Sequence, residues 1–162
     1  MSHSQGTERE ARKSAGLDAR TVELVQASWA KVLPIADTAA TLFYGRLFEL
    51  DPALRPLFKN DIGEQKMKLM QTLSVAVGGL ADPGRLVPVL RALGARHVAY
   101  RVADRHYDLV GEALLWTLRK GLGEGFTPEV EAAWGEVYGL VAAVMKQGAA
   151  EHRDGVSVHA RS

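Results

Sequence analysis

Residues 93–139 read LGARHVAYRVADRHYDLVGEALLWTLRKGLGEGFTPEVEAAWGEVYG, and this stretch decides the fold class. Its apolar side chains return every three or four residues, which is the spacing of one face of an α-helix. One stripe comprises Val110, Leu114, Leu118 and Leu122. A second follows Thr127 and Pro128, a pair typical of a helix start, and comprises Val130, Trp134, Val137, Val141 and Met145. We therefore predict two consecutive helices, the first from His106 to Leu122.

The chain before this stretch has the same helical period. Asp18 is a capping residue before the first stripe, and Pro34 interrupts that helix. Further helices are expected over about 36–50, in a short turn after Asp51 that ends near Phe58, over about 63–80, and after the Asp-Pro pair at 82–83. No segment alternates with the period of a β-strand, so we predict an all-α fold of about seven helices.

Length and composition indicate one domain. A chain of 162 residues that is 47% hydrophobic can bury a single core. Residues 1–17 are polar and short of large apolar side chains, and so is the stretch from 150 to the end. We therefore expect a flexible extension over 1–17, a folded domain over 18–149 and a flexible tail over 150–162.

Charge and residue types exclude several partners. The net charge is +1 and the 20 Lys and Arg residues are scattered, which argues against nucleic acid. The chain contains no cysteine, so disulfides and thiolate ligands are excluded. The first residues lack an apolar signal region, and nowhere do eighteen apolar residues run together, so we expect no membrane partner and a cytoplasmic protein.

Three polar residues lie on apolar stripes and are candidates for chemistry. His97 ends the stripe formed by Leu86, Leu90 and Leu93; by position alone it is more often a core or boundary histidine than a metal ligand. Tyr44 lies on the stripe of its helix, where it either finds a hydrogen-bond partner or reaches solvent. Gln65 lies one turn before Leu69, where an exposed glutamine is equally ordinary.

Neighbouring motifs favour a ligand-binding role for these residues over an ordinary core or surface role. The stretch over 93–139 strongly resembles the second half of bacterial single-domain globins and of the haem domain of flavohaemoglobins, and is also similar to neuroglobin. Upstream, LFYGRLFELDPALRPLF and EQKMKLMQTL resemble the first half. The resemblance spans Leu17 to Gly148. It implies the three-over-three helical sandwich of the globins around a haem b, iron protoporphyrin IX, which without cysteine is held non-covalently.

The resemblance also implies roles for individual residues. His97 falls on the iron ligand, whereas His106, which is followed by Tyr107, marks the start of the next helix. Phe58 matches a phenylalanine that packs against the porphyrin. Tyr44 and Gln65, with Leu69, are placed over the open sixth coordination site. Further haem contacts are implied for Leu93, Val102, Tyr107 and Val110.

Two cations are candidates for the haem propionates. Lys68 and Arg96 lie where the pocket mouth is expected, and solvated helix charges are an equally good interpretation of both.

The distal residues predict slow release of oxygen. A phenol and an amide N–H both donate to a partly negative ligand, and hydrogen bonds to charged groups contribute about 1.5–3 kcal/mol. Two such donors slow oxygen escape by roughly tens- to thousands-fold relative to an apolar pocket. Glutamine is a poor iron ligand, so we expect an open, five-coordinate ferrous state.

One departure from the family weakens the case for catalysis. In flavohaemoglobins a late glutamate in the last helix lies behind the iron ligand and increases its electron donation. Ala149 stands at that place here, and Glu151 is about 200° further around the helix. We therefore expect His97 to donate its second N–H to a backbone carbonyl near Leu93.

Two classes of function follow from the resemblance. The first is reversible binding of oxygen, nitric oxide and carbon monoxide, with possible conversion of nitric oxide to nitrate by means of a separate reductase. The second is a haem-based gas sensor or interaction module, for which the ends of the chain are expected to be too short to carry a transmitter. A haem-free helical bundle is a third alternative, and a monomer and a homodimer both remain open.

Overall fold

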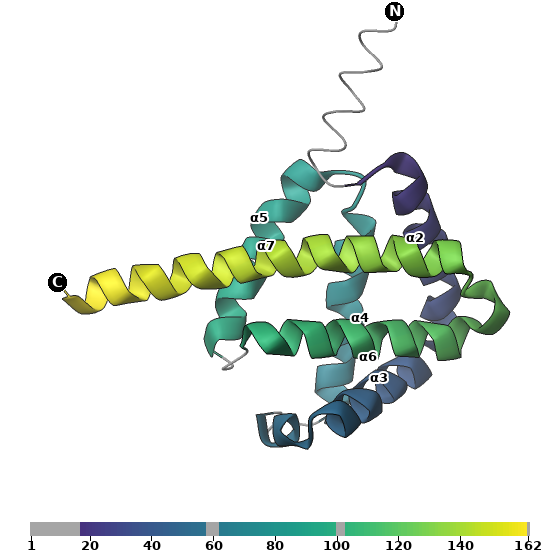
Figure 1. Ribbon diagram of the computed structural model, residues 1–162, viewed down its shortest axis with the longest axis horizontal. Helices are drawn as coiled ribbons and strands as arrows, with labels where there is room; N and C mark the ends of the chain where they lie inside the picture. The colour runs from purple at the N-terminus through teal and green to yellow at the C-terminus, as the bar shows by residue number, and fades with distance from the viewer. Residues whose placement is uncertain (1–16, 58–61, 100–102, 162) are drawn as a thin grey trace, which may run out of the picture.

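The computed structural model describes residues 17–57, 62–99 and 103–161, and all regular structure in these ranges is helical. The predicted all-α fold class is thereby confirmed. The elements in chain order are α2 (Ala19–Val32), η1 (Leu33–Ile35), α3 (Ala36–Leu50), η2 (Pro52–Leu57), α4 (Ile62–Gly78), α5 (Pro83–Ala99), α6 (Asp104–Leu122), η3 (Gly123–Gly125) and α7 (Pro128–Arg161). Helices α6 and α7 run beside each other; α7 packs across α5 and α2, and α6 packs on α3 and α2 (Figure 1).

The ends of α2 follow from local chemistry. The Asp18 carboxylate accepts a hydrogen bond of 2.8 Å from the Thr21 backbone N–H, which also lowers the pKa of Asp18. At the other end Pro34 lies within η1, a single turn of 3-10 helix. The predicted cap and the predicted interruption are both confirmed.

Two tryptophans join α2 to α4 and α7 in the core. Trp29 and Trp134 are both buried, with ring centroids 6.0 Å apart. The Trp134 indole N–H donates to Ser28 Oγ at 2.8 Å, and the Trp29 indole N–H donates to Ser74 Oγ at 3.2 Å. Each buried indole N–H therefore has a partner, which avoids the cost of an unpaired buried donor.

The α6–α7 hairpin depends on a turn and a close approach. Gly123 ends α6 with φ of 55°, a conformation that favours glycine. Thr127 caps α7 by accepting from the Val130 N–H at 3.2 Å. At the far end, the Tyr138 hydroxyl donates to the backbone carbonyl of Tyr107. A Cβ at Gly111 would lie 2.8 Å from Cδ1 of the Tyr138 ring and closer still to Cε1, so only glycine allows this approach.

Several boundaries differ from the predictions. The short turn near 52–57 is a 3-10 helix, so the described residues contain six α-helices. Helix α6 begins at Asp104, because the His106 side chain caps it: Nδ1 accepts from the Ala103 N–H at 2.9 Å. Leu17, assigned to the extension, is buried in the core. Residues 1–16 lie outside the described ranges.

The C-terminal stretch differs most from its prediction. A flexible tail was expected from residue 150, but α7 continues as a helix to Arg161. Polar composition suggested a tail, yet no proline follows Pro128, and Ala149, Ala150 and Glu151 favour helix continuation. In the described part of the chain, no helix has both the length and the apolar composition that crossing a membrane requires.

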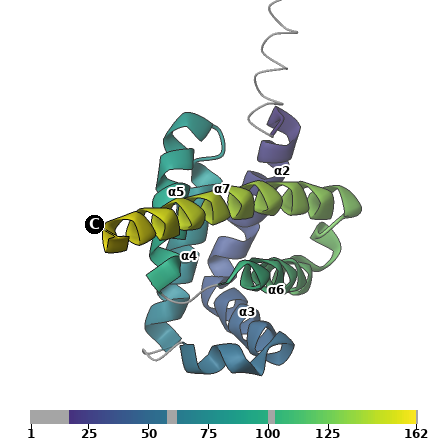
Figure 2. The same cartoon turned by 60° about the vertical axis from the view of Figure 1, so that its left-hand side comes forward.

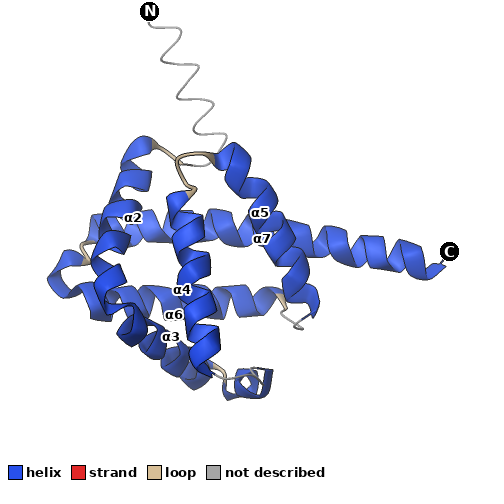
Figure 3. Ribbon diagram, turned by 180° about the vertical axis from the view of Figure 1, so that it is seen from behind, coloured by secondary structure: helices blue, strands red, loops and turns tan. Residues whose placement is uncertain are grey.

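The whole arrangement is seen from two further directions. The view turned by 60° shows α7 passing over both α4 and α5, with α6 on the side of α3 (Figure 2). The view from behind shows α4 in the middle of the fold, between α2 and α5 (Figure 3). Residues placed on α4 can therefore face the interior enclosed by the other helices.

Candidate functional site

Tyr44 and Gln65 meet where α3 packs on α4. The Tyr44 side chain is buried, and its hydroxyl donates to the backbone carbonyl oxygen of Gln65 at 3.3 Å. The ring is held edge-on to Phe43, with centroids 5.1 Å apart, and lies 6.0 Å from the ring of Phe48. The two residues that the resemblance assigned to the distal side therefore lie next to each other, although 21 positions separate them in the chain.

Burial extends the pH range over which Tyr44 stays neutral. Loss of solvation raises its pKa from 10.0 to about 12, because the phenolate is the charged form. At neutral pH the side chain is a neutral phenol and a hydrogen-bond donor. Ionisation of this hydroxyl requires strongly alkaline solution.

The side chains that follow Gln65 along α4 divide between interior and solvent. Gln65 and Leu69 are half-buried and four residues apart, on one face of the helix. Lys68 is exposed, and its Nζ lies 3.5 Å from Glu64 Oε1. This placement matches a solvated helix charge, and a role toward a propionate stays a prediction.

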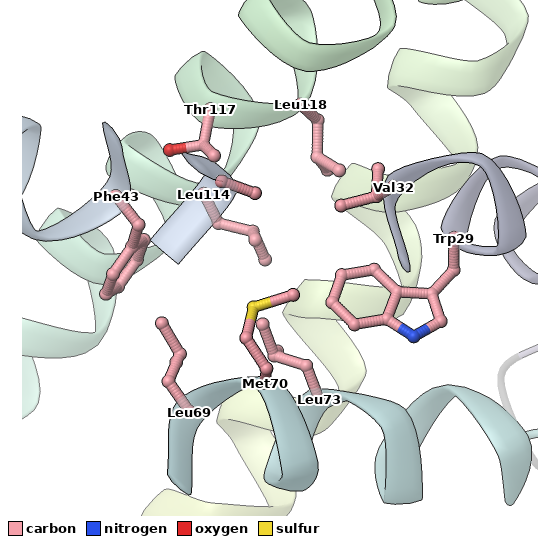
Figure 4. Close-up of a pocket in the computed structure, with 10 residues that line it drawn as sticks. Trp29, Val32, Phe43, Leu69, Met70, Leu73, Leu114, Thr117 and Leu118 are labelled. Atoms are coloured by element: carbon pink, nitrogen blue, oxygen red, sulfur yellow. The ribbon is translucent and has the colours of Figure 1, made fainter. Parts of the chain in front are cut away.

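A small apolar cavity lies near Tyr44, because Phe43, whose ring packs edge-on against the Tyr44 ring, is one of its lining residues (Figure 4). Its volume is about 10 Å³, and its walls come from α2, α3, α4 and α6. Thr117 is its one polar lining residue, and the Thr117 hydroxyl donates within α6 to the Ala113 carbonyl at 2.8 Å. The lining residues are Trp29, Val32, Ala39, Phe43, Leu69, Met70, Leu73, Leu114, Thr117 and Leu118. Phe43 and Leu69 connect this cavity to the surroundings of Tyr44.

Sequence reasoning did not identify this cavity. Leu114 and Leu118 were assigned to an apolar stripe, which predicts that they face the interior. Periodicity cannot tell which four helices leave a gap between them, because that depends on how side chains of different shape meet in three dimensions.

Helix α5 carries the expected iron ligand. His97 lies in the last turn of α5, and its side chain is outside the described part. Leu93, one turn earlier, is half-buried, whereas Arg96 is exposed. The ligand role of His97 stays a prediction.

Further candidate contacts lie on α6. Tyr107 is buried and Val110 is half-buried in the first turns of this helix. Lys146 of α7 has its Nζ 5.6 Å from the centre of the Tyr107 ring. Phe58 and Val102 lie outside the described residues.

Helix α7 has alanine at position 149, where the family resemblance places a glutamate. Ala149 is 1% exposed, whereas Glu151, two residues later, is exposed. The two side chains therefore point in different directions from α7, in agreement with the sequence argument that Glu151 does not replace the missing glutamate. Within the described ranges no three His, Cys, Asp or Glu residues cluster as a metal site.

The chemistry of these residues fits a haem. A porphyrin needs apolar walls, and gas binding at its iron needs neutral donors that do not themselves ligate strongly. Leu69, Leu114 and Val110 supply apolar surface from two helices, and Tyr44 supplies a buried neutral hydroxyl. Gln65 contributes an uncharged amide.

Comparison with known proteins gives the family. The family model described as Globin matches residues 41–145. The flavohemoprotein of Bacillus subtilis (strain 168) is 27% identical over 129 residues, covering 78% of this chain and 32% of the relative. The flavohemoprotein of Xylella fastidiosa (strain 9a5c) is 31% identical over 147 residues, which cover 88% of this chain and 36% of the relative. This chain thus spans about a third of the length of both flavohemoproteins.

The neuroglobin of Tetraodon nigroviridis is 31% identical over 150 residues, covering 84% of this chain and 94% of the relative. The match along the chain and the all-helical structure agree with the resemblance seen in the sequence, and the chain belongs to the globin family.

Proposed function

We propose that this globin holds haem b through His97 and binds oxygen, nitric oxide and carbon monoxide reversibly on the side of Tyr44 and Gln65. The observation that carries the proposal is the buried Tyr44 side chain: its hydroxyl lies 3.3 Å from the Gln65 carbonyl oxygen, and its ring packs on Phe43, which lines an apolar cavity. The chain has no cysteine, so attachment is non-covalent. When bound, the haem supplies an iron centre that takes diatomic ligands and exchanges single electrons.

Tyr44 is suited to donate a hydrogen bond in this pocket. The phenol carries its proton at neutral pH, and its buried position strengthens any hydrogen bond to a polarised ligand. The Gln65 carbonyl that it faces also lies within the hydrogen-bond ladder of α4. The phenol can therefore turn toward a ligand without leaving that carbonyl unsatisfied.

On the other side of the pocket, His97 would be oriented by its own helix. We propose that its second N–H donates to the carbonyl of Leu93, one turn back on α5. No carboxylate stands at the buried position of Ala149 to increase electron donation from the imidazole. This arrangement favours ligand binding over bond cleavage.

Conversion of nitric oxide is the proposed catalytic use of this site. Nitric oxide, oxygen and one electron combine to give nitrate, so each turnover requires a reductase to supply the electron. The role of the chain's own residues is to retain oxygen beside Tyr44 until nitric oxide arrives. A sensor role has no specific support among the contacts above.

The proposal is tested by haem binding and gas spectra. The purified protein, titrated with haem, is expected to give ferric, ferrous and carbon monoxide spectra with a strong Soret band. His97→Ala is expected to lose or strongly alter these spectra, whereas His152→Ala, at an exposed position of α7, leaves them unchanged. Absence of a Soret band after haem addition would refute the proposal.

Nitric oxide consumption is then measured with a reductase supplied. Loss of one nitric oxide per protein without turnover leaves binding as the function.

A further inference from the structure

Helices α5 and α7 touch through their backbones at two glycines. A Cβ built on Gly94 of α5 would lie 2.8 Å from the Cα of Met145 and closer still to its carbonyl oxygen. A Cβ on Gly148 of α7 would lie 2.7 Å from the Cα of Arg91 and closer still to that carbonyl. Each glycine therefore faces the main chain of the other helix, and we call this contact the glycine crossing.

The glycine crossing differs from ordinary helix packing. Helix axes usually lie about 8–10 Å apart, because side chains separate them. Here no side chain lies between the two backbones at Gly94 and Gly148, and α5 and α7 form the most extensive helix pair of the described structure. Figures 1 and 3 show the two helices crossing.

The close contact is confined to these two positions. A Cβ at Gly135 or Gly139, also on α7, would have no atom within 4 Å. A Cβ at Gly84, near the start of α5, would meet only the Asp82 side chain at 3.8 Å. Among the glycines of α5 and α7 whose surroundings the structure describes, only those at the crossing thus face a backbone that a methyl group would meet.

The crossing lies next to the residue assigned to the iron. Gly94 precedes His97 by three residues, less than one turn of α5. On α7, Gly148 is followed by the buried Ala149. A contact between two backbones cannot be relaxed by a change of rotamer, so it determines the distance of this turn of α5 from α7.

We infer that Gly94 and Gly148 are positioning residues that set how closely His97 approaches the haem iron. The inference rests on the proposed role of His97. Non-bonded carbon atoms lie at least about 3.5 Å apart, so a methyl group at either glycine must move α5 by roughly 1 Å. Binding sites need their ligands placed to within about 0.5 Å, so a shift of that size changes the bond to iron.

The test compares identical substitutions at the crossing and away from it. The haem-loaded Gly94→Ala and Gly148→Ala variants are measured beside Gly84→Ala and Gly139→Ala, which add the same methyl group to the same helices in open space. Readouts are the iron–histidine stretching band of the ferrous protein and the rate of haem transfer to an acceptor apoprotein. Circular dichroism and Tm report on folding.

At the crossing, we expect a shifted and broadened iron–histidine band and haem loss about 10- to 100-fold faster than in the controls. A wild-type band and wild-type haem loss in both crossing variants would overturn the inference, even if Tm falls, because the glycines would then serve packing alone. It is equally overturned if circular dichroism shows that both crossing variants are unfolded, since the pair is then a requirement of folding. A wild-type protein without an iron–histidine band contradicts the proposed function instead, so the two failures are distinct.

Discussion

Replacing Tyr44 by phenylalanine removes one oxygen atom from the centre of the candidate site. The phenylalanine ring keeps the contacts with Phe43 and Phe48, so the change isolates the hydroxyl. In the ligand-free protein this hydroxyl donates to the Gln65 carbonyl at 3.3 Å, a bond between neutral groups that contributes about 0.5–1.5 kcal/mol. We expect the variant to lose about 1 kcal/mol of unfolding free energy.

The same bond limits what Tyr44 offers to a ligand. Donation to a charged acceptor contributes about 1.5–3 kcal/mol, but the hydroxyl must first give up the Gln65 carbonyl, which costs about 0.5–1.5 kcal/mol. The net gain is about 1 kcal/mol, which corresponds to about fivefold in a rate. Oxygen should therefore leave Tyr44→Phe about fivefold faster. This effect is smaller than the range expected from two unopposed donors.

Stopped-flow displacement of oxygen by carbon monoxide measures this rate in the ferrous protein. Chemical denaturation of the same two proteins measures the stability difference. Phe43→Leu serves as a control, because it alters the packing of the Tyr44 ring and keeps its hydroxyl. An oxygen dissociation rate in Tyr44→Phe that is unchanged from wild type would refute the reasoning that this hydroxyl donates to the ligand.

Further predictions concern stability. Ser28→Ala leaves the buried Trp134 indole N–H without its acceptor, so the unfolding free energy measured by urea denaturation should fall by about 1–3 kcal/mol. An unchanged urea midpoint would contradict the hydrogen bond assigned between Trp134 and Ser28. The Tyr44 pKa of about 12 in the folded state exceeds the ordinary 10.0, so the unfolded chain loses this proton first between these values. Tyr44 should therefore contribute about 2 kcal/mol to the fall in unfolding free energy as pH rises from 10 to 12, and Tyr44→Phe should reduce the fall by that amount; equal slopes in the two proteins would exclude this contribution. Ala149→Glu places a carboxylate at a buried position and should lower Tm markedly. The control Ala150→Glu, at the exposed neighbouring position, should change Tm little. Similar Tm values in the two variants would show that the position of Ala149 has room for the carboxylate.

Much of the helical framework follows from local rules. Asp18 caps α2 and Pro34 ends it, because side-chain capping and the missing proline N–H act within a few residues. Leu86 and Leu90 are buried as their spacing predicts. The C-terminal stretch is helical to Arg161 despite its polar composition, because Ala149, Ala150 and Glu151 favour helix continuation.

The site itself depends on contacts that spacing does not encode. The burial of Tyr44 follows from its stripe, but its bond to Gln65 joins two helices and was suggested only by the family resemblance. Gly94 and Gly148 are unremarkable in the sequence, since a glycine within a helix does not tell which backbone approaches it. The same applies to the cavity, whose walls come from four helices.

The central claim is that His97 holds the haem, and one measurement tests it directly. The ferrous spectrum of His97→Gly is recorded with and without added imidazole. If His97 is the ligand, the variant lacks the wild-type iron–histidine band, and imidazole entering the vacated space restores a band close to it. If the variant without imidazole retains the wild-type band, another residue holds the iron and the account is wrong.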